Sequence, residues 1–286
     1  MISLQAYSKI NLTLEVLARR SDGYHEVASV LQTISLADTL TFEPGATIDF
    51  RCNVPNLQSP DNLVLKAAKL LQETAGCTKG AVIHLTKKIP VAAGLGSGAT
   101  DAAAALVGLN RLWELNLPLN RLTELAAKLG SDVAFFLYGG TALAKGRGEL
   151  VTPLPDVPEF WLVLLKPAVK PIANKTAQLY SQLNSSHFTS GQHTQKLITH
   201  LNHGGMIEAQ FLYNVFEQVA FDFFPGLSDH RSILLKAGGR SFHLAGSGPT
   251  LFSLVPDKAQ GENILKYLKQ KGLEAYLVHS ANAAST

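Results

Sequence analysis

The chain has 286 residues, 46% hydrophobic and 16% charged, with a formal net charge of +3. This balance is typical of a globular protein with room for two domains, and the charge is too small to indicate a nucleic-acid partner. Two cysteines without metal-type spacing, no basic-then-apolar leader and no apolar run of membrane-spanning length predict a cytoplasmic protein with no membrane partner.

The first half of the chain mixes strands and helices. Strands are expected at 2–7, 10–17, 33–51 (two strands) and 81–86, and in the second of these apolar and polar residues alternate. A helix is expected from Leu63 to Thr74, begun by the turn-forming residues 60–62 and ended at Gly76. Two more helices are expected at 100–112 and at 121–129, the latter capped by Asn120.

The second half begins after a proline-rich segment. Prolines around Asp156 mark the expected boundary, which gives domains 1–155 and 156–286. Strands are expected at 160–165, 241–245, 250–255 and 274–279. Helices are expected at 172–183, 193–201, 227–236 and 257–270, and Asn214–Glu217 is placed in a further helix.

The segment from Pro90 to Thr100 carries the strongest local signal. Gly94, Gly96 and Gly98 alternate with other residues between a predicted strand and a predicted helix. A glycine-rich turn that opens a helix exposes N–H donors and the positive end of the helix dipole, which suits an anion such as phosphate. A P-loop is excluded because no lysine lies in the segment. Two other interpretations of the segment stay open: a purely structural turn and a dinucleotide-binding fingerprint. The fingerprint is disfavoured because several residues separate the glycines from the preceding strand.

Four further residues have both a structural and a functional interpretation. Lys9 could be a solvated lysine or a functional cation flanked by short polar residues. Asp132 could cap a helix or act as a base. Tyr24 and His25, which follow the turn at 20–23, could pack in the core or stack on a flat ligand.

Three motifs considered together resemble those of the GHMP kinases, and in the same order. They are Ser8-Lys-Ile-Asn-Leu12, Pro90-x3-Gly-Leu-Gly-Ser-Gly98 and Leu244-Ala-Gly-Ser-Gly-Pro249. Within that superfamily the chain resembles kinases that phosphorylate the 2-hydroxyl of a cytidine-diphosphate-linked methylerythritol, on the segments 6–12, 20–26, 60–64 and 130–136. The resemblance implies an α+β fold of two lobes, with an N-terminal lobe like domain 2 of ribosomal protein S5, a ferredoxin-like C-terminal lobe and the active site in the cleft between them.

The resemblance also implies roles for individual residues. Lys9 and Asp132 match the catalytic pair, and Asn11, Tyr24 and His25 match substrate-binding residues. ATP, with Mg2+, is implied as the co-substrate. The implied ATP-binding residues are Pro90, Val91, Ala92, Ala93, Gly94, Leu95, Gly96, Ser97, Gly98, Ala99 and Thr100 in the loop, with Asn62 and Lys87 near the adenine. No metal ligand is assigned, and the protein is expected to be a monomer or homodimer acting on a small molecule.

The chain departs from the family pattern at two places. The usual loop reads Gly-Leu-Gly-Gly-Gly-Ser-Ser, whereas here Ser97 replaces a glycine and Ala99-Thr100 replaces Ser-Ser. In Asn214-Val-Phe-Glu217, Val215 stands where an aspartate is common, so no role is assigned to that carboxylate position. Homoserine and mevalonate kinases are rivals within the superfamily, but Tyr24 and His25 argue against them because their substrates have no base to stack. A non-catalytic nucleotide-binding or dinucleotide-dependent protein is the rival from another class; it would need neither Lys9 nor Asp132.

Overall fold

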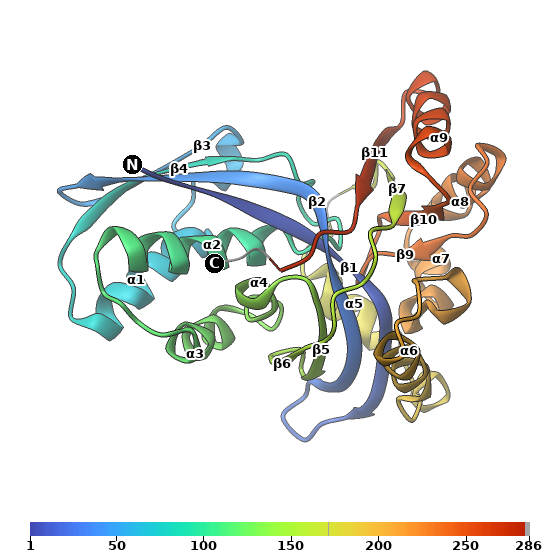
Figure 1. The fold of residues 1–286 in the computed structure, drawn as a ribbon, viewed down its shortest axis with the longest axis horizontal. Coiled ribbons are helices and arrows are strands. Elements are labelled where there is room, and N and C mark those ends of the chain that lie inside the picture. The colour runs from blue at the N-terminus through green and yellow to red at the C-terminus, as the bar shows by residue number, and fades with distance from the viewer. Residues whose placement is uncertain (171, 284–286) are drawn as a thin grey trace. The chain divides into compact units, whose positions relative to one another are not determined.

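The computed structural model describes residues 1–170 and 172–283, and in this part of the chain it confirms the α+β class. The described strands form a seven-stranded and a four-stranded sheet (Figure 1). The chain divides into two compact units, and both contain residues of the first two strands. Unit 1 comprises Met1–Ser8, Leu36–Val91 and Gly96–Gly139, and unit 2 comprises Lys9–Ser35, Ala92–Leu95 and the residues from Gly140 onward. The expected boundary at 155–156 stays a prediction.

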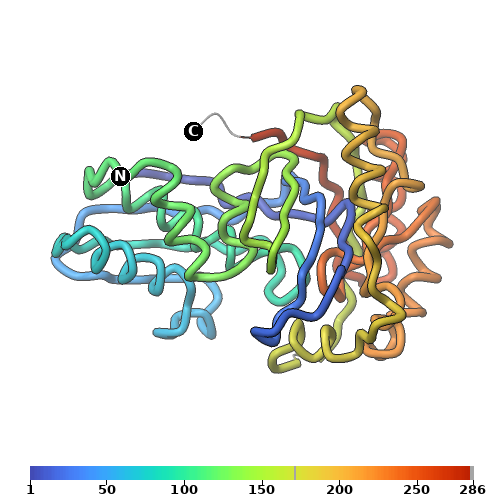
Figure 2. The backbone as a smooth tube through the Cα atoms, turned by 90° about the horizontal axis from the view of Figure 1, so that it is seen from below, coloured from blue at the N-terminus to red at the C-terminus, as the bar shows by residue number. Residues whose placement is uncertain are grey.

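Two long neighbouring strands open the chain and appear in blue in Figure 2. They are β1 (Ile2–Arg19) and β2 (His25–Gly45), joined by a turn in which the N–H of Arg20 donates to the Tyr24 carbonyl at 2.8 Å. Because the extended backbone continues through Ser8 and Lys9, β1 replaces the two separate strands expected at 2–7 and 10–17.

Unit 1 packs a layer of helices on a sheet. Its remaining elements are β3 (Ile48–Cys52), α1 (Leu63–Ala75), β4 (Gly80–Thr86), α2 (Ser97–Leu112), α3 (Leu119–Leu129) and α4 (Phe135–Tyr138), with a short 3-10 turn at Pro55–Leu57. β4 pairs antiparallel with the end of β2 and parallel with β3. The alanines of α2 permit close packing: α1, α2 and α3 contact one another, and a Cβ added at Gly108 would lie 2.3 Å from Phe42 of β2.

The ends of the helices in unit 1 follow local signals in the sequence. The Asn62 side chain accepts a hydrogen bond from the N–H of Val64 and so caps α1, while Gly76 ends α1 in the left-handed region with φ of 59°. Both ends confirm the expectation. The helix expected at 121–129 begins earlier, at Leu119, with Pro118 as its N-cap, so the assignment of Asn120 as the cap was wrong.

Unit 2 contains the four-stranded sheet, whose order is β11-β7-β10-β9. The strands of unit 2 that follow β2 are β5 (Thr141–Gly146), β6 (Leu150–Pro153), β7 (Trp161–Lys166), β8 (Tyr213–Asn214), β9 (His243–Leu244), β10 (Leu251–Val255) and β11 (Glu274–His279). Of these, β5, β6 and β8 belong to the seven-stranded sheet. Its helices are α5 (Lys175–Ser181), α6 (Gln192–Asn202), α7 (Ala220–Phe223), α8 (Leu227–Lys236) and α9 (Lys258–Gln270), and 3-10 turns lie at Ser185–His187, Ala209–Phe211 and Val215–Gln218. Helix α9 packs on β7, β10 and β11, and α8 packs beside α9 (Figure 1).

Most elements expected in the second half are present, but three are shorter. α5 covers part of 172–183, and β9 retains two residues of the strand expected at 241–245. Asn214 ends β8 and caps the 3-10 turn Val215–Gln218 instead of lying inside a helix.

Candidate functional site

Lys9 and Asn11 lie side by side in β1, within unit 2. Although both are polar, they are only 4% and 5% exposed. The Lys9 Nζ donates to Asn11 Oδ1 at 2.8 Å, and Asn11 Nδ2 donates to Ser29 Oγ, also at 2.8 Å. Ser29 in turn donates to the carbonyl of Thr13 at 2.6 Å. This chain of hydrogen bonds fixes the amide orientation of Asn11, so Lys9 is a buried, oriented cation and not a solvated surface lysine.

The first part of the glycine-rich loop, Ala92–Leu95, belongs to the same unit. The N–H of Lys9 donates to the Leu95 carbonyl at 3.1 Å. Gly94 has φ of +85°, and a Cβ placed on it would lie 2.0 Å from the carbonyl oxygen of Ala245. Glycine at position 94 is therefore required by close packing against the third motif as well as by backbone conformation.

The third motif forms a turn directly beside Lys9. A Cβ on Gly246 would lie 3.1 Å from Lys9 Nζ and 3.3 Å from Asn11 Oδ1. Asn214 holds this turn, because its Nδ2 donates to the carbonyls of Leu244 at 2.7 Å and of Gly246 at 2.8 Å. Sequence reasoning placed Asn214 in a helix and missed this role; a buried asparagine next to a glycine-rich motif carried no local signal for it.

Glu217, to which no role was given, also supports this region. Its Oε1 accepts a hydrogen bond from the N–H of Leu244 at 2.9 Å and lies 3.3 Å from Nδ1 of His243. The carboxylate therefore has a structural contact with the strand that leads into the third motif.

An aromatic cluster lies at the start of β2, again in unit 2. The His25 ring stacks on Tyr180 of α5 with centroids 4.9 Å apart, and Phe188 meets His25 edge-on at 6.0 Å. Burial, and then the charge of Arg19, lowers the pKa of His25, so its ring is neutral at pH 7. Tyr24 is 54% exposed and lies under the guanidinium of Arg147, 4.8 Å from its ring centroid. Tyr180 was not identified from the sequence, because it lies far along the chain from His25.

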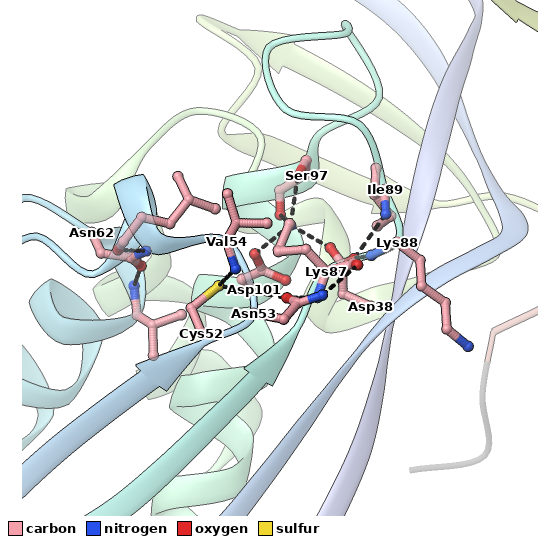
Figure 3. Close-up of polar contacts among 12 residues, drawn as sticks. Asp38, Cys52, Asn53, Val54, Asn62, Lys87, Lys88, Ile89, Ser97 and Asp101 are labelled. Atoms are coloured by element: carbon pink, nitrogen blue, oxygen red, sulfur yellow. Dashed lines mark hydrogen bonds and ion pairs between the residues drawn. The ribbon is translucent and has the colours of Figure 1, made fainter. Parts of the chain in front are cut away.

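In unit 1 the ammonium of Lys87 is the centre of a buried polar cluster (Figure 3). It forms ion pairs with Asp38 and, at 2.7 Å, with Oδ2 of Asp101, and it donates to Oγ of Ser97 at 2.6 Å. The three charged side chains are at most 5% exposed. Lys87 was expected near the adenine; that role stays a prediction, while the structure shows the ammonium engaged with the first turn of α2.

The cluster carries one positive and two negative groups. Asp38 Oδ1 accepts the N–H groups of Lys88 and Ile89, at 2.5 and 2.8 Å, which anchors the chain just before the glycine-rich loop (Figure 3). Burial raises the pKa of Asp101 to about 7, with the Asp38 charge acting in the same direction and Lys87 opposing it. Asp101 therefore titrates near neutral pH.

The second part of the loop leads into α2. Gly96 is the N-cap, with φ of 76°, and Ser97 is the first helical residue. The first N–H groups of a helix have no intrahelical acceptor, so this end can bind an anion. Ser97 is 8% exposed and its hydroxyl faces Lys87. The serine that replaces the usual glycine is therefore part of the buried cluster.

Asn62 and Asp132 also lie in unit 1. The Asn62 amide donates to the Leu57 carbonyl at 2.9 Å in addition to capping α1. Asp132 is partly exposed, in the turn that precedes α4. Because α4 begins at Phe135 and its N-cap is Ala134, the carboxylate is not the N-cap of that helix.

Within residues 1–170 and 172–283, no group of three or more His, Cys, Asp or Glu side chains is arranged to hold a metal ion. No helix of this part of the chain has the length and apolar character to cross a membrane. We therefore assign no metal ligand.

Comparison with known proteins gives matches over nearly the whole chain. Residues 62–140 match the family described as GHMP kinases N terminal domain, and residues 197–274 match GHMP kinases C terminal. The chain is 46% identical over 278 residues to 4-diphosphocytidyl-2-C-methyl-D-erythritol kinase of Dehalococcoides mccartyi strain 195, covering 97% of this chain and 98% of the relative. It is 40% identical to the enzyme of the same name from Geobacillus kaustophilus, over 94% and 93% of the two chains. A crystal structure of 4-(cytidine 5'-diphospho)-2C-methyl-D-erythritol kinase superimposes with a TM-score of 0.83 at 32% identity, covering 99% and 100% of the chains.

Proposed function

Because the chain belongs to the 4-diphosphocytidyl-2-C-methyl-D-erythritol kinase family of GHMP kinases, we propose that it phosphorylates the 2-hydroxyl of that substrate. ATP is the co-substrate, and the products are the 2-phosphate and ADP. The reaction belongs to isopentenyl diphosphate biosynthesis by the non-mevalonate route. The observation that carries the proposal is 46% identity along 97% of the chain to a relative of that name.

In phosphoryl transfer the protein contributes mainly by positioning the reactants and by stabilising the charge that develops. The substrate 2-oxygen attacks the γ-phosphorus, the bond to the β–γ bridging oxygen breaks, and ADP leaves. Asp132 accepts the proton of the hydroxyl, a contribution typically worth about 10²–10⁴-fold in rate. Lys9 supplies a positive charge where negative charge develops; its support is the buried position and the hydrogen bond to Asn11 at 2.8 Å.

The glycine-rich loop holds the phosphates through main-chain N–H groups. The conformations of Gly94 and Gly96, with φ of +85° and +76°, support this assignment because such a turn leaves donors free of side-chain cover. Mg2+ bound with the nucleotide would supply positive charge to the phosphate oxygens, and no residue of this chain is assigned as its ligand. Ala99 has no hydroxyl, so side-chain donors contribute less here than in the usual loop.

The cytidyl group is recognised by the aromatic cluster. His25 is oriented by stacking on Tyr180, and a neutral imidazole can both donate to and accept from the edge of a pyrimidine. Tyr24, which is exposed, offers a flat face for the base. Asn11 contributes an amide next to Lys9.

The decisive experiment measures ATP consumption by the purified protein with Mg2+ and 4-diphosphocytidyl-2-C-methyl-D-erythritol. The matched control is 2-C-methyl-D-erythritol 4-phosphate, which lacks the cytidyl group. We expect ATP to be consumed only with the cytidylated compound, and we expect the product to carry a phosphate on its 2-oxygen. Consumption with neither compound, by folded protein that binds ATP, would refute the substrate assignment.

A further inference from the structure

Lys175 joins the two glycine-rich segments of unit 2. It is the first residue of α5, and its Nζ donates to the carbonyls of Ala92 at 3.1 Å, Ser247 at 3.3 Å and Gly248. Ala92 lies in the first part of the glycine-rich loop, whereas Ser247 and Gly248 lie in the third motif. One ammonium therefore uses its three N–H donors on main-chain acceptors from two segments that are more than 150 residues apart in sequence.

Within the described part of the chain, the partners of this ammonium are main-chain carbonyl dipoles and not counter-ions. A buried cation without a carboxylate is costly, and burial followed by the charge of Lys9 lowers the pKa of Lys175 to about 8. Below that pH the group is an ammonium, so it adds a second positive charge close to Lys9. Three carbonyl contacts satisfy its donors and leave that charge uncancelled.

The loop conformation at the contact is one that a side chain disfavours. Ala92 has φ of +56°, in the left-handed region that is unfavourable for a residue with a Cβ. The contact from Lys175 holds the Ala92 carbonyl in this conformation. Carbonyl oxygens carry partial negative charge and would repel a nearby phosphate. Because three of them accept hydrogen bonds from the Lys175 ammonium, their repulsion of a phosphate is reduced.

We propose that Lys175 is a positioning residue for the nucleotide phosphates: it fixes the Ala92 end of the loop to the third motif and keeps the loop electropositive. The inference rests on the proposed use of ATP, but not on the identity of the phosphoryl acceptor. A second contact, between Thr176 Oγ1 and Ser247 Oγ at 3.0 Å, links α5 to the same turn. Removal of the ammonium should therefore alter the loop without detaching α5.

The test is calorimetric titration of Lys175→Met with the non-hydrolysable β,γ-imido analogue of ATP, with adenosine and with CDP. Lys79→Met is the matched control, because Lys79 Nζ also donates to a main-chain carbonyl, that of Trp113 at 2.9 Å, but contacts neither glycine-rich segment. We expect the triphosphate to bind at least about tenfold more weakly to Lys175→Met, as for loss of a charged donor. Adenosine and CDP affinities should stay within about twofold, and Lys79→Met should bind all three as the parent protein does.

Lys175→Gln distinguishes the effect of the Lys175 charge from that of its hydrogen bonds. It also replaces the methionine variant in the test if that variant does not fold. Its amide can retain carbonyl contacts but carries no charge, so we expect an intermediate loss of triphosphate affinity. Unchanged triphosphate affinity in both variants, or an equal loss for triphosphate, adenosine and CDP, would overturn the proposal. A parent protein that binds the triphosphate but phosphorylates no cytidylated substrate would refute the proposed function alone.

Discussion

Replacing Lys87 by methionine should destabilise unit 1 far more than the same substitution at a surface lysine. The Lys87 ammonium is shared by Asp38 and Asp101, and it also binds the hydroxyl of Ser97 (Figure 3). Methionine retains most of the volume of the lysine side chain, so the cavity is small. The main consequence is that two buried carboxylates lose the cation between them.

The size of the effect follows from burial. Removing one partner of a buried ion pair costs about 3–5 kcal/mol, because the remaining charge is left without compensation. Asp101 can offset part of this by taking up a proton, since its pKa is already raised to about 7. We therefore expect the free energy of unfolding to fall by about 3 kcal/mol near neutral pH.

The matched control is Lys66→Met. Lys66 Nζ lies 3.2 Å from Oδ1 of Asp61, but the two side chains are 49% and 91% exposed. Exposed pairs contribute roughly 0–1 kcal/mol, so the control should change stability by less than about 1 kcal/mol. The difference between the two variants isolates the effect of burial.

The two tryptophans of the chain provide a local readout. Trp113 is buried in unit 1, where its indole N–H donates to the Gly80 carbonyl at 3.0 Å, and Trp161 lies in unit 2. In a Trp161→Phe background, Trp113 emission during urea unfolding reports on unit 1 alone. If Lys87→Met shifts the unfolding free energy no more than Lys66→Met does, the reasoning about the buried cluster is wrong.

Three further outcomes are expected. The pKa of Asp101 is raised from 3.8 to about 7, so between these two pH values the folded protein binds one proton more than the unfolded chain. The free energy of unfolding should therefore fall by up to about 1.4 kcal/mol per pH unit as the pH rises through this range. Asp101→Asn should abolish this slope in urea titrations from pH 4.5 to 7.5, and a retained slope would refute the assignment. Gly94→Ala places a methyl 2.0 Å from the Ala245 carbonyl and should reduce ATP affinity at least about tenfold in the same calorimetric titration. Gly272→Ala, which shares the positive φ (+72°) but lies outside the loop and has nothing within 4 Å of the added Cβ, should have little effect on ATP affinity. Asp132→Asn should retain ATP binding while kcat falls by at least about 10²-fold, and near-normal turnover would exclude this residue as the base.

The sequence predicts local features of the fold well because their causes are local. Asn62 caps α1 two residues ahead, and Gly76 ends the helix with φ of 59°. The α8, α9 and β11 segments lie within one residue of where their apolar spacing puts them. The start of α3 was misplaced because Asn120 is a good cap residue, but Pro118 with its fixed φ begins the helix first.

The contacts that build the candidate site are not local, and this is why sequence reasoning missed several of them. Lys175 meets Ala92 across 83 residues, and Lys87 meets Asp38 across 49. A lysine in either position has the same local pattern as a surface lysine, because its environment is decided by which segments the fold brings to it. The motif resemblance implied roles for Lys9 and the loop, which stay predictions, and it gave no role to Lys175, Tyr180 or Asn214.

Ser97, which departs from the family pattern, has a role that the motif comparison did not predict and the structure shows. In the usual loop a glycine stands there, and from the sequence alone a serine would add a donor for phosphate. The Ser97 hydroxyl instead accepts a hydrogen bond from the Lys87 ammonium at 2.6 Å, and the residue is 8% exposed. Since Ala99 supplies no hydroxyl either, we infer that phosphate binding at the start of α2 depends on main-chain N–H groups, whose positions depend on the buried cluster beneath them.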